Sequence, residues 1–313
     1  MKIEAHGLTK RYGSTVAVDE LSFEVLPGRV TGFLGPNGAG KSTTLRMIMG
    51  LDTPTAGSVT VGGRPYGQHR RPLFEVGGLL DAKAIHGGRS AYNHLLCLAQ
   101  SNGIGRARVG EVLEMVGLTG VAKKRAGGFS LGMGQRLGIA AALLGDPQVL
   151  LFDEPVNGLD PEGIVWIRTF MRALAAEGRT VFVSSHLMSE MALTADDLIV
   201  IGRGRLIAAS SVADFVQHSS HNFVRVRSPQ LDRLRAVLVA SGGIITVEAD
   251  GALAVAGLDP AEIGDLAAAN RLALHELAPQ LASLEDAFME LTRDSVDYHA
   301  DAHDPHLLMA KGA

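Results

Sequence analysis

The sequence lacks the features of several protein classes. Its 313 residues include one cysteine, Cys97, which excludes an internal disulfide and most cysteine metal sites. No uninterrupted apolar stretch approaches the roughly 18 residues of a membrane-spanning helix, and residues 1–4 begin no secretory signal. Basic residues do not predominate: 29 Lys and Arg against 33 Asp and Glu give a formal net charge of -4, without an electrostatic footprint for nucleic acid. We therefore expect a soluble, cytoplasmic protein that binds no nucleic acid and touches a membrane only through a partner.

Glycine, in contrast, is abundant, and several glycines follow directly after an apolar run at 30–34. This segment fits the pattern GxxxxGK[ST] and precedes a helical-looking stretch at 44–49. Glycines let successive backbone N–H groups turn toward one ligand, and the N-terminus of the following helix favours an anion. Taken alone, the segment also fits a glycine-rich turn without a ligand. The pattern predicts a nucleotide phosphate loop made of Gly35, Pro36, Asn37, Gly38, Ala39, Gly40, Lys41, Ser42 and Thr43.

Two side chains of this loop carry the predicted chemistry. Lys41 supplies a positive charge for the β and γ phosphates, and Ser42 offers a hydroxyl to Mg²⁺. A second segment far along the chain supports the interpretation, because the apolar run at 149–152 ends in Asp153 and Glu154. Acids at the tip of a buried strand usually have a cation or a catalytic task, since burying an unpaired charge is costly. We expect Asp153 to hold Mg²⁺ and Glu154 to polarise the attacking water.

Three further positions lie where a nucleotide site would need them. Tyr12 has little to bury it and could stack on adenine, although an ordinary strand-edge tyrosine would look the same. Ser130 caps a long predicted helix whose N-terminus is a second candidate anion site, although most capped helices bind nothing. His186 ends the apolar run at 180–185 and is a candidate γ-phosphate contact, although a histidine at a strand end is more often structural.

In this order and spacing, the segments resemble the ATP-binding subunit of ABC transporters, and the resemblance covers residues 1 to about 215. In that family two ATPase domains dimerise head to tail, and each signature serine meets the γ-phosphate held by the opposite P-loop. The resemblance implies ATP and Mg²⁺ as cofactors and a dimer, homomeric by expectation, with two ATP molecules at its interface. The resemblance implies that Tyr12 stacks on adenine and that Ser130, Gly132 and the residues up to Gln135 form the signature. It also implies that Asp153 and Glu154 are the Walker B acid and the catalytic glutamate. Asp160 would then belong to the D-loop, and His186 would be the switch histidine.

Two positions depart from the usual pattern of this family. Asp81 stands where a Q-loop glutamine is usual, so its part in sensing Mg²⁺ or the membrane partner is open. The signature, usually LSGGQ, reads Phe129-Ser130-Leu131-Gly132-Met133. This variant is similar to a subset of bacterial exporters of drugs, antibiotics and other amphiphiles, whose membrane subunit is typically a separate six-helix protein.

The resemblance therefore implies an ATPase that powers an exporter from the inner face of the cell membrane, through a separate transmembrane permease. The alternatives are a soluble or regulatory ABC ATPase that is not coupled to transport, and a module that closes on ATP without turnover. Within the class of transporter ATPases, the nearest alternative is an ATPase that powers an importer. The complete acid and histidine set at Glu154 and His186 favours turnover. The transported molecule is not disclosed, because the ATPase need not touch it.

The predicted fold class is α/β, with a P-loop ABC ATPase domain at 1–218 that contains a helical subdomain at about 82–140. The first strands are expected at 3–8 and 21–25 with a turn between them at 9–15. An accessory α+β domain is expected at 219–297, in the order βαββαβ of a ferredoxin-like fold, with its last strand at 272–277. Residues 298–313 are expected to form a disordered tail.

Overall fold

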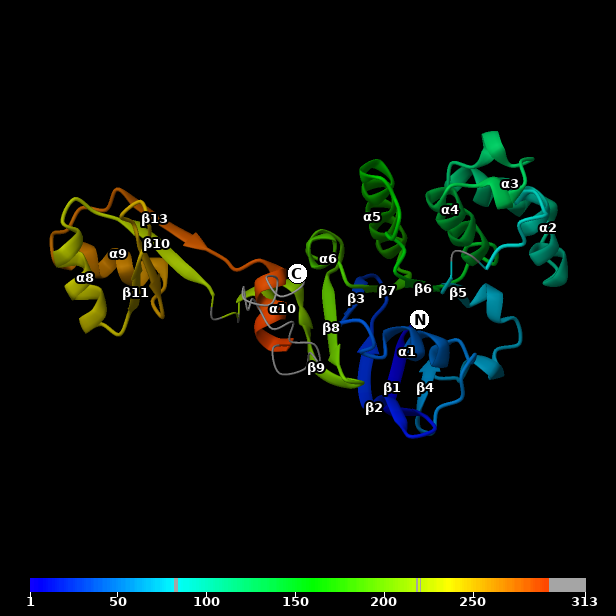
Figure 1. Ribbon diagram of the computed structural model, residues 1–313, viewed down its shortest axis with the longest axis horizontal. Helices are drawn as coiled ribbons and strands as arrows, with labels where there is room; N and C mark the ends of the chain where they lie inside the picture. The colour runs from blue at the N-terminus through cyan, green and yellow to red at the C-terminus, as the bar shows by residue number, and fades with distance from the viewer. Residues whose placement is uncertain (82–83, 218, 220, 293–313) are drawn as a thin grey trace, which may run out of the picture. The chain divides into compact units, whose positions relative to one another are not determined.

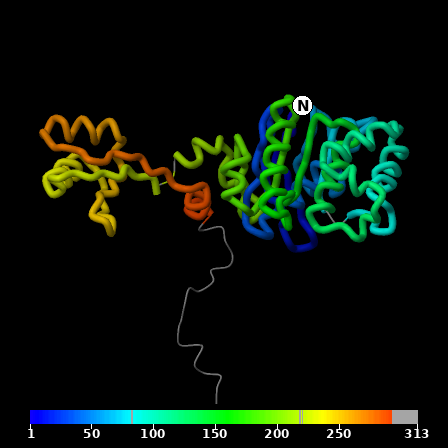
Figure 2. Tube along the Cα trace, turned by 90° about the horizontal axis from the view of Figure 1, so that it is seen from above, coloured from blue at the N-terminus to red at the C-terminus, as the bar shows by residue number. Residues whose placement is uncertain are grey.

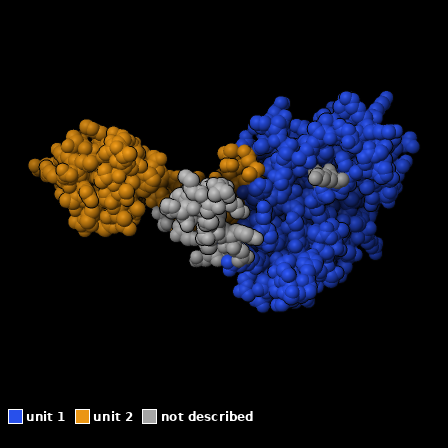
Figure 3. Space-filling view, viewed as in Figure 1, with its two compact units in different colours: residues 1–186, 199–209, 292–313 blue, residues 187–198, 210–291 orange. Residues whose placement is uncertain are grey.

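The computed structural model describes residues 1–81, 84–217, 219 and 221–292. The chain forms two compact units, which are coloured separately in Figure 3. The first is built mainly of residues 1–186 and 199–209, and the second of residues 187–198 and 210–291. None of the described helices is long and apolar enough to cross a membrane.

The first unit is organised around a six-stranded sheet in the order β5-β6-β7-β3-β8-β9. The four strands β5, β6, β7 and β3 run parallel, so their carboxyl ends lie at one edge of the sheet. β6 pairs Asp153 with Ser184 of β7, and β7 pairs Ser185 with Leu34 of β3. This register brings the phosphate loop, the acid pair and His186 to the same edge. The bounds are β3 Val30–Leu34, β5 Val76–Leu79, β6 Val149–Asp153, β7 Thr180–Ser185, β8 Asp197–Gly202 and β9 Arg205–Ser211.

A second, antiparallel sheet has the order β2-β1-β4, formed by β1 (Ile3–Tyr12), β2 (Thr15–Val25) and β4 (Ala56–Val61). The expected turn at 9–15 was wrong in extent. Only Gly13 and Ser14 turn, because Gly13 alone takes a left-handed φ of 59° and β1 continues to Tyr12. Phe23 of this sheet packs against Phe33 and Phe182 of the parallel sheet, with ring centroids 5.7–5.9 Å away, and this contact joins the two sheets in one core.

The helical insertion of the first unit contains α2, α3 and α4, which lie together in Figure 1. Within this insertion α2 ends at Ser101 and α3 begins at Arg106, and Gly103 between them lies in the left-handed region. The sequence analysis assigned no elements to 187–217, where β8, β9 and two short helices lie. The helices are α1 Lys41–Ile48, α2 Ala91–Ser101, α3 Arg106–Met115, α4 Leu131–Ala142, α5 Pro161–Ala176, α6 Met188–Thr194 and α7 Val212–Gln217, with 3-10 turns η1 Tyr66–Gln68, η2 Pro72–Phe74, η3 Thr119–Val121 and η4 Ala126–Gly128.

The second unit contains a small α+β domain, coloured yellow to orange in Figure 2. Its elements follow the order β10, α8, β11, β12, α9, β13, and its antiparallel sheet has the strand order β11-β12-β10-β13. Leu234 and Leu238 of α8 and Ile263 of α9 pack with the valines of β10 and β12 in one core. The bounds are β10 Phe223–Arg227, α8 Leu231–Ala240, β11 Ile244–Val247, β12 Leu253–Ala256, α9 Pro260–Ala269, β13 Glu276–Gln280 and, after this sheet, α10 Leu284–Thr292.

One strand of this domain was predicted too early. The expected strand at 272–277 begins instead at Glu276, because Leu272 enters the core from the loop that follows α9. β13 then pairs Leu277 with Val226 of β10, which buries the apolar side of the strand. The expected disordered tail at 298–313 lies outside the described residues.

Candidate active site

The phosphate loop connects β3 to α1 and opens onto a cavity of about 240 Å³. Gly40 precedes α1 with φ 103°, and a Cβ at this position would lie 2.4 Å from the carbonyl oxygen of Ala17. Only glycine therefore fits between the loop and the neighbouring strand. Most of the predicted loop residues line the cavity, together with the predicted acid Glu154: Ala17, Asn37, Gly38, Ala39, Gly40, Lys41, Ser42, Thr43 and Glu154.

Lys41 lies buried in this cavity, where the loop itself holds its ammonium group. Nζ donates hydrogen bonds to the carbonyl oxygens of Gly35 at 2.6 Å and Pro36 at 3.3 Å. These two residues do not line the cavity, so they act on it through Lys41. Burial lowers the pKa of Lys41, and the carboxylates of Glu154 and Asp153 oppose that shift. The result is a fixed cation at the cavity wall, at a position where an anionic ligand would replace the loop carbonyls as its partner.

Glu154 joins three parts of the site. Its Oε1 lies 3.9 Å from Lys41 Nζ, and its Oε2 lies 2.8 Å from His186 Nδ1. Its backbone has φ 50°, a left-handed conformation that is uncommon outside glycine and is found at strained functional positions. The structure thus brings three predicted residues together, with the Glu154 carboxylate between the Lys41 ammonium group and the His186 ring.

Ser184 was missed by the sequence analysis although it organises the acid pair. Its side chain is fully buried, and its hydroxyl donates a hydrogen bond to Asp153 Oδ1 and accepts one from the backbone N–H of Glu154 at 3.0 Å. The contact depends on the register of β6 against β7, which no local sequence pattern discloses. Gln135 of α4 contacts the segment that follows β6, which the sequence did not predict either. Its Nε2 lies 3.5 Å from the carbonyl oxygen of Glu154 and 3.4 Å from that of Asn157.

Ser184→Ala should lower ATP turnover more than ATP affinity, because the change releases Asp153 and the Glu154 backbone and leaves the phosphate loop at 35–43 unaltered. A buried carboxylate that loses its donor costs about 1–3 kcal/mol, so the melting temperature should also fall. Turnover, ATP affinity and melting temperature check this expectation. The matched control is Thr31→Val on neighbouring β3, whose buried hydroxyl has no partner in the described structure and whose loss should be harmless. Equal effects of the two changes would contradict the assignment.

The predicted signature and D-loop residues lie together in a separate hollow of about 400 Å³. Ser130 caps α4 by accepting a hydrogen bond from the Met133 N–H at 3.2 Å, which confirms the predicted cap. Asp160 caps α5 in the same way, through the Gly163 N–H at 2.8 Å. The residues that line the hollow are Ser130, Leu131, Gly132, Met133, Arg136, Gly158, Leu159, Asp160, Glu162 and Gly163.

An aromatic contact fixes the wall of this hollow. The Arg136 guanidinium of α4 lies 4.0 Å from the ring centroid of Trp166 on α5, and its Nη1 donates to the carbonyl oxygen of Val116 at 3.0 Å. Trp166 in turn stacks on Phe170, with ring centroids 5.3 Å apart. The cation therefore ties the signature helix to the helix that follows the D-loop.

Six predicted residues line neither cavity. Four of them, Gly35, Pro36, Asp153 and His186, adjoin or contact residues of the phosphate cavity, and the other two are Tyr12 and Asp81. Tyr12 ends β1 and is 48% exposed, so its ring is accessible to a base. Asp81 follows β5 on the exposed surface, and its side chain is absent from the lining of the phosphate cavity. The structure therefore groups the predicted residues into a phosphate cavity with its acids and histidine, a signature hollow, and two outlying positions.

A phosphate loop and an acid pair at the carboxyl edge of one parallel sheet, with a helical insertion and a separate capped signature helix, define a P-loop ATPase of the ABC class. The family model described as ABC transporter matches residues 18–157, and a model described as a domain of unknown function, DUF8746, matches residues 222–285. YhcH of Bacillus subtilis strain 168, described as an uncharacterized ABC transporter ATP-binding protein, is 35% identical over 298 residues, which cover 94% of this chain and 96% of that protein. The chain belongs to the ATP-binding proteins of ABC transporters and is an ABC ATPase.

Two further similarities each cover about two thirds of the chain. The bacitracin transport ATP-binding protein BcrA of Bacillus licheniformis is 43% identical over 208 residues, which cover 66% of this chain and 68% of that protein. A solved structure described as the ATP binding subunit of an ABC transporter matches with a TM-score of 0.63 at 25% identity, over 69% of this chain and 92% of that chain. The predicted fold is therefore confirmed as an ABC ATPase domain followed by a small α+β domain.

Proposed function

We propose that the chain powers the export of antibiotics or other amphiphilic molecules through a separate membrane subunit. The observation that carries the proposal is the Lys41–Glu154–His186 arrangement, in which the carboxylate lies 3.9 Å from the Lys41 ammonium group and 2.8 Å from the His186 ring. The bacitracin transport protein among the relatives supports the substrate class. In this proposal the chain lies in the cytoplasm at the inner face of the cell membrane.

ATP occupies the phosphate cavity in this proposal. Lys41 exchanges its loop carbonyls for the β and γ phosphates, and the loop N–H groups hold the same anions. Glu154 accepts a proton from, or orients, the attacking water, and His186 both fixes the Glu154 carboxylate and contacts the γ-phosphate. The role of each residue is a proposal that rests on these contacts.

Magnesium is the metal that the donor set fits. Ser42 supplies a hydroxyl in the cavity lining, and Asp153 supplies a carboxylate held by Ser184. Oxygen donors of this kind, together with substrate phosphates, suit Mg²⁺, which retains several of its waters. Ser42 and Asp153 would hold the ion, which neutralises charge on the phosphates when bound. Asp81 is proposed to contact the ion or the nucleotide only in the loaded state.

Two copies of the chain are proposed to enclose two ATP molecules. The signature hollow is separate from the phosphate cavity and offers the N-terminus of α4 with Ser130 and Gly132. Such a helix N-terminus favours an anion, so each hollow would receive the γ-phosphate held by the partner, with Asp160 beside it. A homodimer would then complete both sites.

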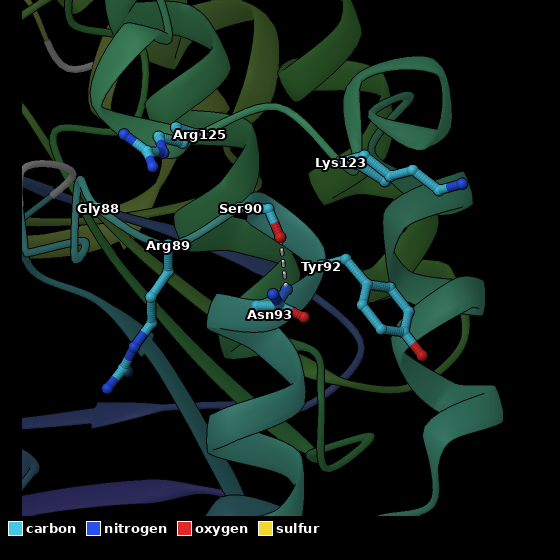
Figure 4. Close-up of a pocket in the computed structure, with 8 residues that line it drawn as sticks. Gly88, Arg89, Ser90, Tyr92, Asn93, Lys123 and Arg125 are labelled. Atoms are coloured by element: carbon cyan, nitrogen blue, oxygen red, sulfur yellow. Dashed lines mark hydrogen bonds between the residues drawn. The ribbon is translucent and has the colours of Figure 1, made fainter.

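A third hollow, of about 630 Å³, is proposed to face the membrane subunit. Figure 4 shows Arg89 and Ser90 at the start of α2, with Lys123 and Arg125 on the segment between α3 and α4. The side chains around this hollow include three cations and no acid. In the described part of the chain none of these cations has a carboxylate partner. An acidic segment of a permease would supply one.

The experiment is recovery of membrane proteins from detergent-solubilised membranes of the native host, with the Glu154→Gln chain and ATP as bait. Recovery of a six-helix membrane protein supports the proposal, and the double change Lys123→Glu with Arg125→Glu should reduce that recovery at least several-fold. Arg64→Glu, on an exposed loop of the first unit, is the matched control and should leave recovery unchanged. Recovery of ribosomes or DNA factors without a membrane protein would instead support a soluble ABC ATPase.

The domain limits are also proposed from the sequence: an ATPase domain at 1–218 and an accessory domain at 219–297. We propose a ferredoxin-like fold for the accessory domain, supported by its element order and by the strand order β11-β12-β10-β13. The similarity to YhcH covers 94% of the chain and therefore extends through this domain. We propose that it regulates or stabilises the ATPase dimer.

A further inference from the structure

The exposed ring of Tyr12 is held by polar contacts that run through Asp52 to Arg46. The Tyr12 hydroxyl donates a hydrogen bond to Asp52 Oδ2 at 2.9 Å. The same oxygen accepts a hydrogen bond from Arg46 Nε at 2.7 Å. Arg46 lies in the last turn of α1, the helix whose first turn carries Lys41 and Ser42. One carboxylate oxygen therefore connects the ring to α1 through Arg46, in addition to a hydrogen bond between the Tyr12 hydroxyl and the Thr43 side chain of the same helix.

Asp52 is well placed to fix the ring. The Asp52 side chain is only 17% exposed, whereas that of Arg46 is 48% exposed. The preceding residue, Leu51, is anchored to α1, because its backbone N–H donates to the Arg46 carbonyl oxygen at 2.9 Å. The pKa of Asp52 is lowered from the ordinary value of 3.8 by the hydrogen bonds from Arg46 and Tyr12. The carboxylate is therefore ionised at neutral pH, and the contacts are lost only when the pH falls below 3.8, through the lowered pKa.

A second contact leaves one face of the ring for a ligand. Lys10 Nζ lies 5.0 Å from the centroid of the Tyr12 ring and donates to the Thr53 carbonyl oxygen at 2.7 Å. The cation is thus fixed over one ring face, while nearly half of the side chain is exposed. A purine stacked on Tyr12 would therefore lie on the opposite face of the ring.

We infer that Asp52 is a positioning residue for nucleotide binding, which orients the Tyr12 ring for the base and ties it to the phosphate-binding helix through Arg46. The inference rests on the adenine-stacking role expected of Tyr12, which we propose as part of the ATP site. It deepens that proposal, because it makes the geometry of base recognition depend on a residue outside both cavities. Asp52 does not itself touch the nucleotide in this arrangement.

The test compares ATP with inorganic triphosphate, which has phosphates but no base. Asp52→Ala and Tyr12→Phe should each weaken ATP binding roughly 2- to 12-fold, as expected for one hydrogen bond, and the double variant should lose no more than either alone. Triphosphate affinity should not change in Asp52→Ala, because Asp52 lines neither cavity. Glu24→Ala, which removes a comparable exposed ion pair with Lys2, is the control and should leave both affinities unchanged.

Tyr12→Ala separates failure of the inference from failure of the base contact. If this variant weakens ATP binding while Asp52→Ala and Tyr12→Phe do not, the ring binds the base without help from Asp52, and the inference is overturned alone. If Tyr12→Ala leaves ATP affinity unchanged, the base contact is wrong and the inference falls with it. If Asp52→Ala weakens triphosphate as much as ATP, Asp52 acts on the phosphate loop and the positioning role is also overturned.

Discussion

Glu154→Gln should bind ATP about as well as the parent chain and lose nearly all turnover. The amide has the shape of the carboxylate, so the cavity and the Ser184 contact to the Glu154 backbone remain. It cannot take a proton from water, and general-base catalysis of this kind contributes roughly 10²- to 10⁴-fold to a rate. Because ATP then persists, the variant should accumulate as a closed dimer. Steady-state turnover, ATP affinity and size-exclusion chromatography with ATP measure the three expectations.

The first unit offers a matched surface control for Glu154→Gln. Glu177→Gln changes an exposed carboxylate that pairs with Arg179 and should leave turnover and assembly as in the parent. Normal turnover of Glu154→Gln would remove Glu154 from its catalytic role. A loss of ATP affinity equal to the loss of turnover would show instead that the carboxylate acts in binding.

Lys41→Met should weaken ATP binding roughly 10- to 150-fold, because charge-assisted hydrogen bonds to phosphate are worth about 1.5–3 kcal/mol each. The thermal stabilisation that ATP gives the parent should disappear at the same ATP concentration. Without nucleotide, the variant should melt at or above the temperature of the parent. The buried ammonium is itself unfavourable there, as its lowered pKa indicates, and its removal offsets the lost contacts to Gly35 and Pro36.

The difference in stability between the parent chain and Lys41→Met should depend on pH. Burial places the folded pKa of Lys41 below the ordinary 10.5, so the unfolded chain binds more protons between these two values. The stability of the parent should therefore rise relative to Lys41→Met as the pH increases through the folded pKa toward 10.5. Thermal melts at several pH values measure this. Lys124→Met, on an exposed loop, is the control, and an unchanged ATP affinity in Lys41→Met would exclude Lys41 from the site.

The parts of the site that the sequence predicted are those encoded in consecutive residues. The phosphate loop, the acid pair and the Ser130 cap each follow from a short pattern whose local structure is nearly independent of the rest of the chain. Ser184 could not be found in this way, because its task depends on the register between β6 and β7. The contact between Gln135 and the Glu154 loop depends on how α4 packs, which is also a property of the folded chain.

The errors in the fold have similar causes. The first hairpin was predicted with a long turn because polar residues in the second half of β1 lower its apolar alternation, yet their backbone pairs with β2 up to Tyr12. In the accessory domain, Leu272 and Leu274 suggested a strand, but burial of these leucines from a loop satisfied the core equally well. Periodicity identifies which side chains are buried more reliably than it identifies the backbone that buries them.

The contact between Arg136 and Trp166 has a practical consequence for experiments on this protein. Trp166 is the single tryptophan in the sequence, so all indole emission comes from one ring. That ring lies against a guanidinium that also lines the signature hollow. A change in emission on adding nucleotide would therefore report on the surroundings of that half-site alone. The chain carries its own optical probe of assembly, and no dye or cysteine label has to be introduced.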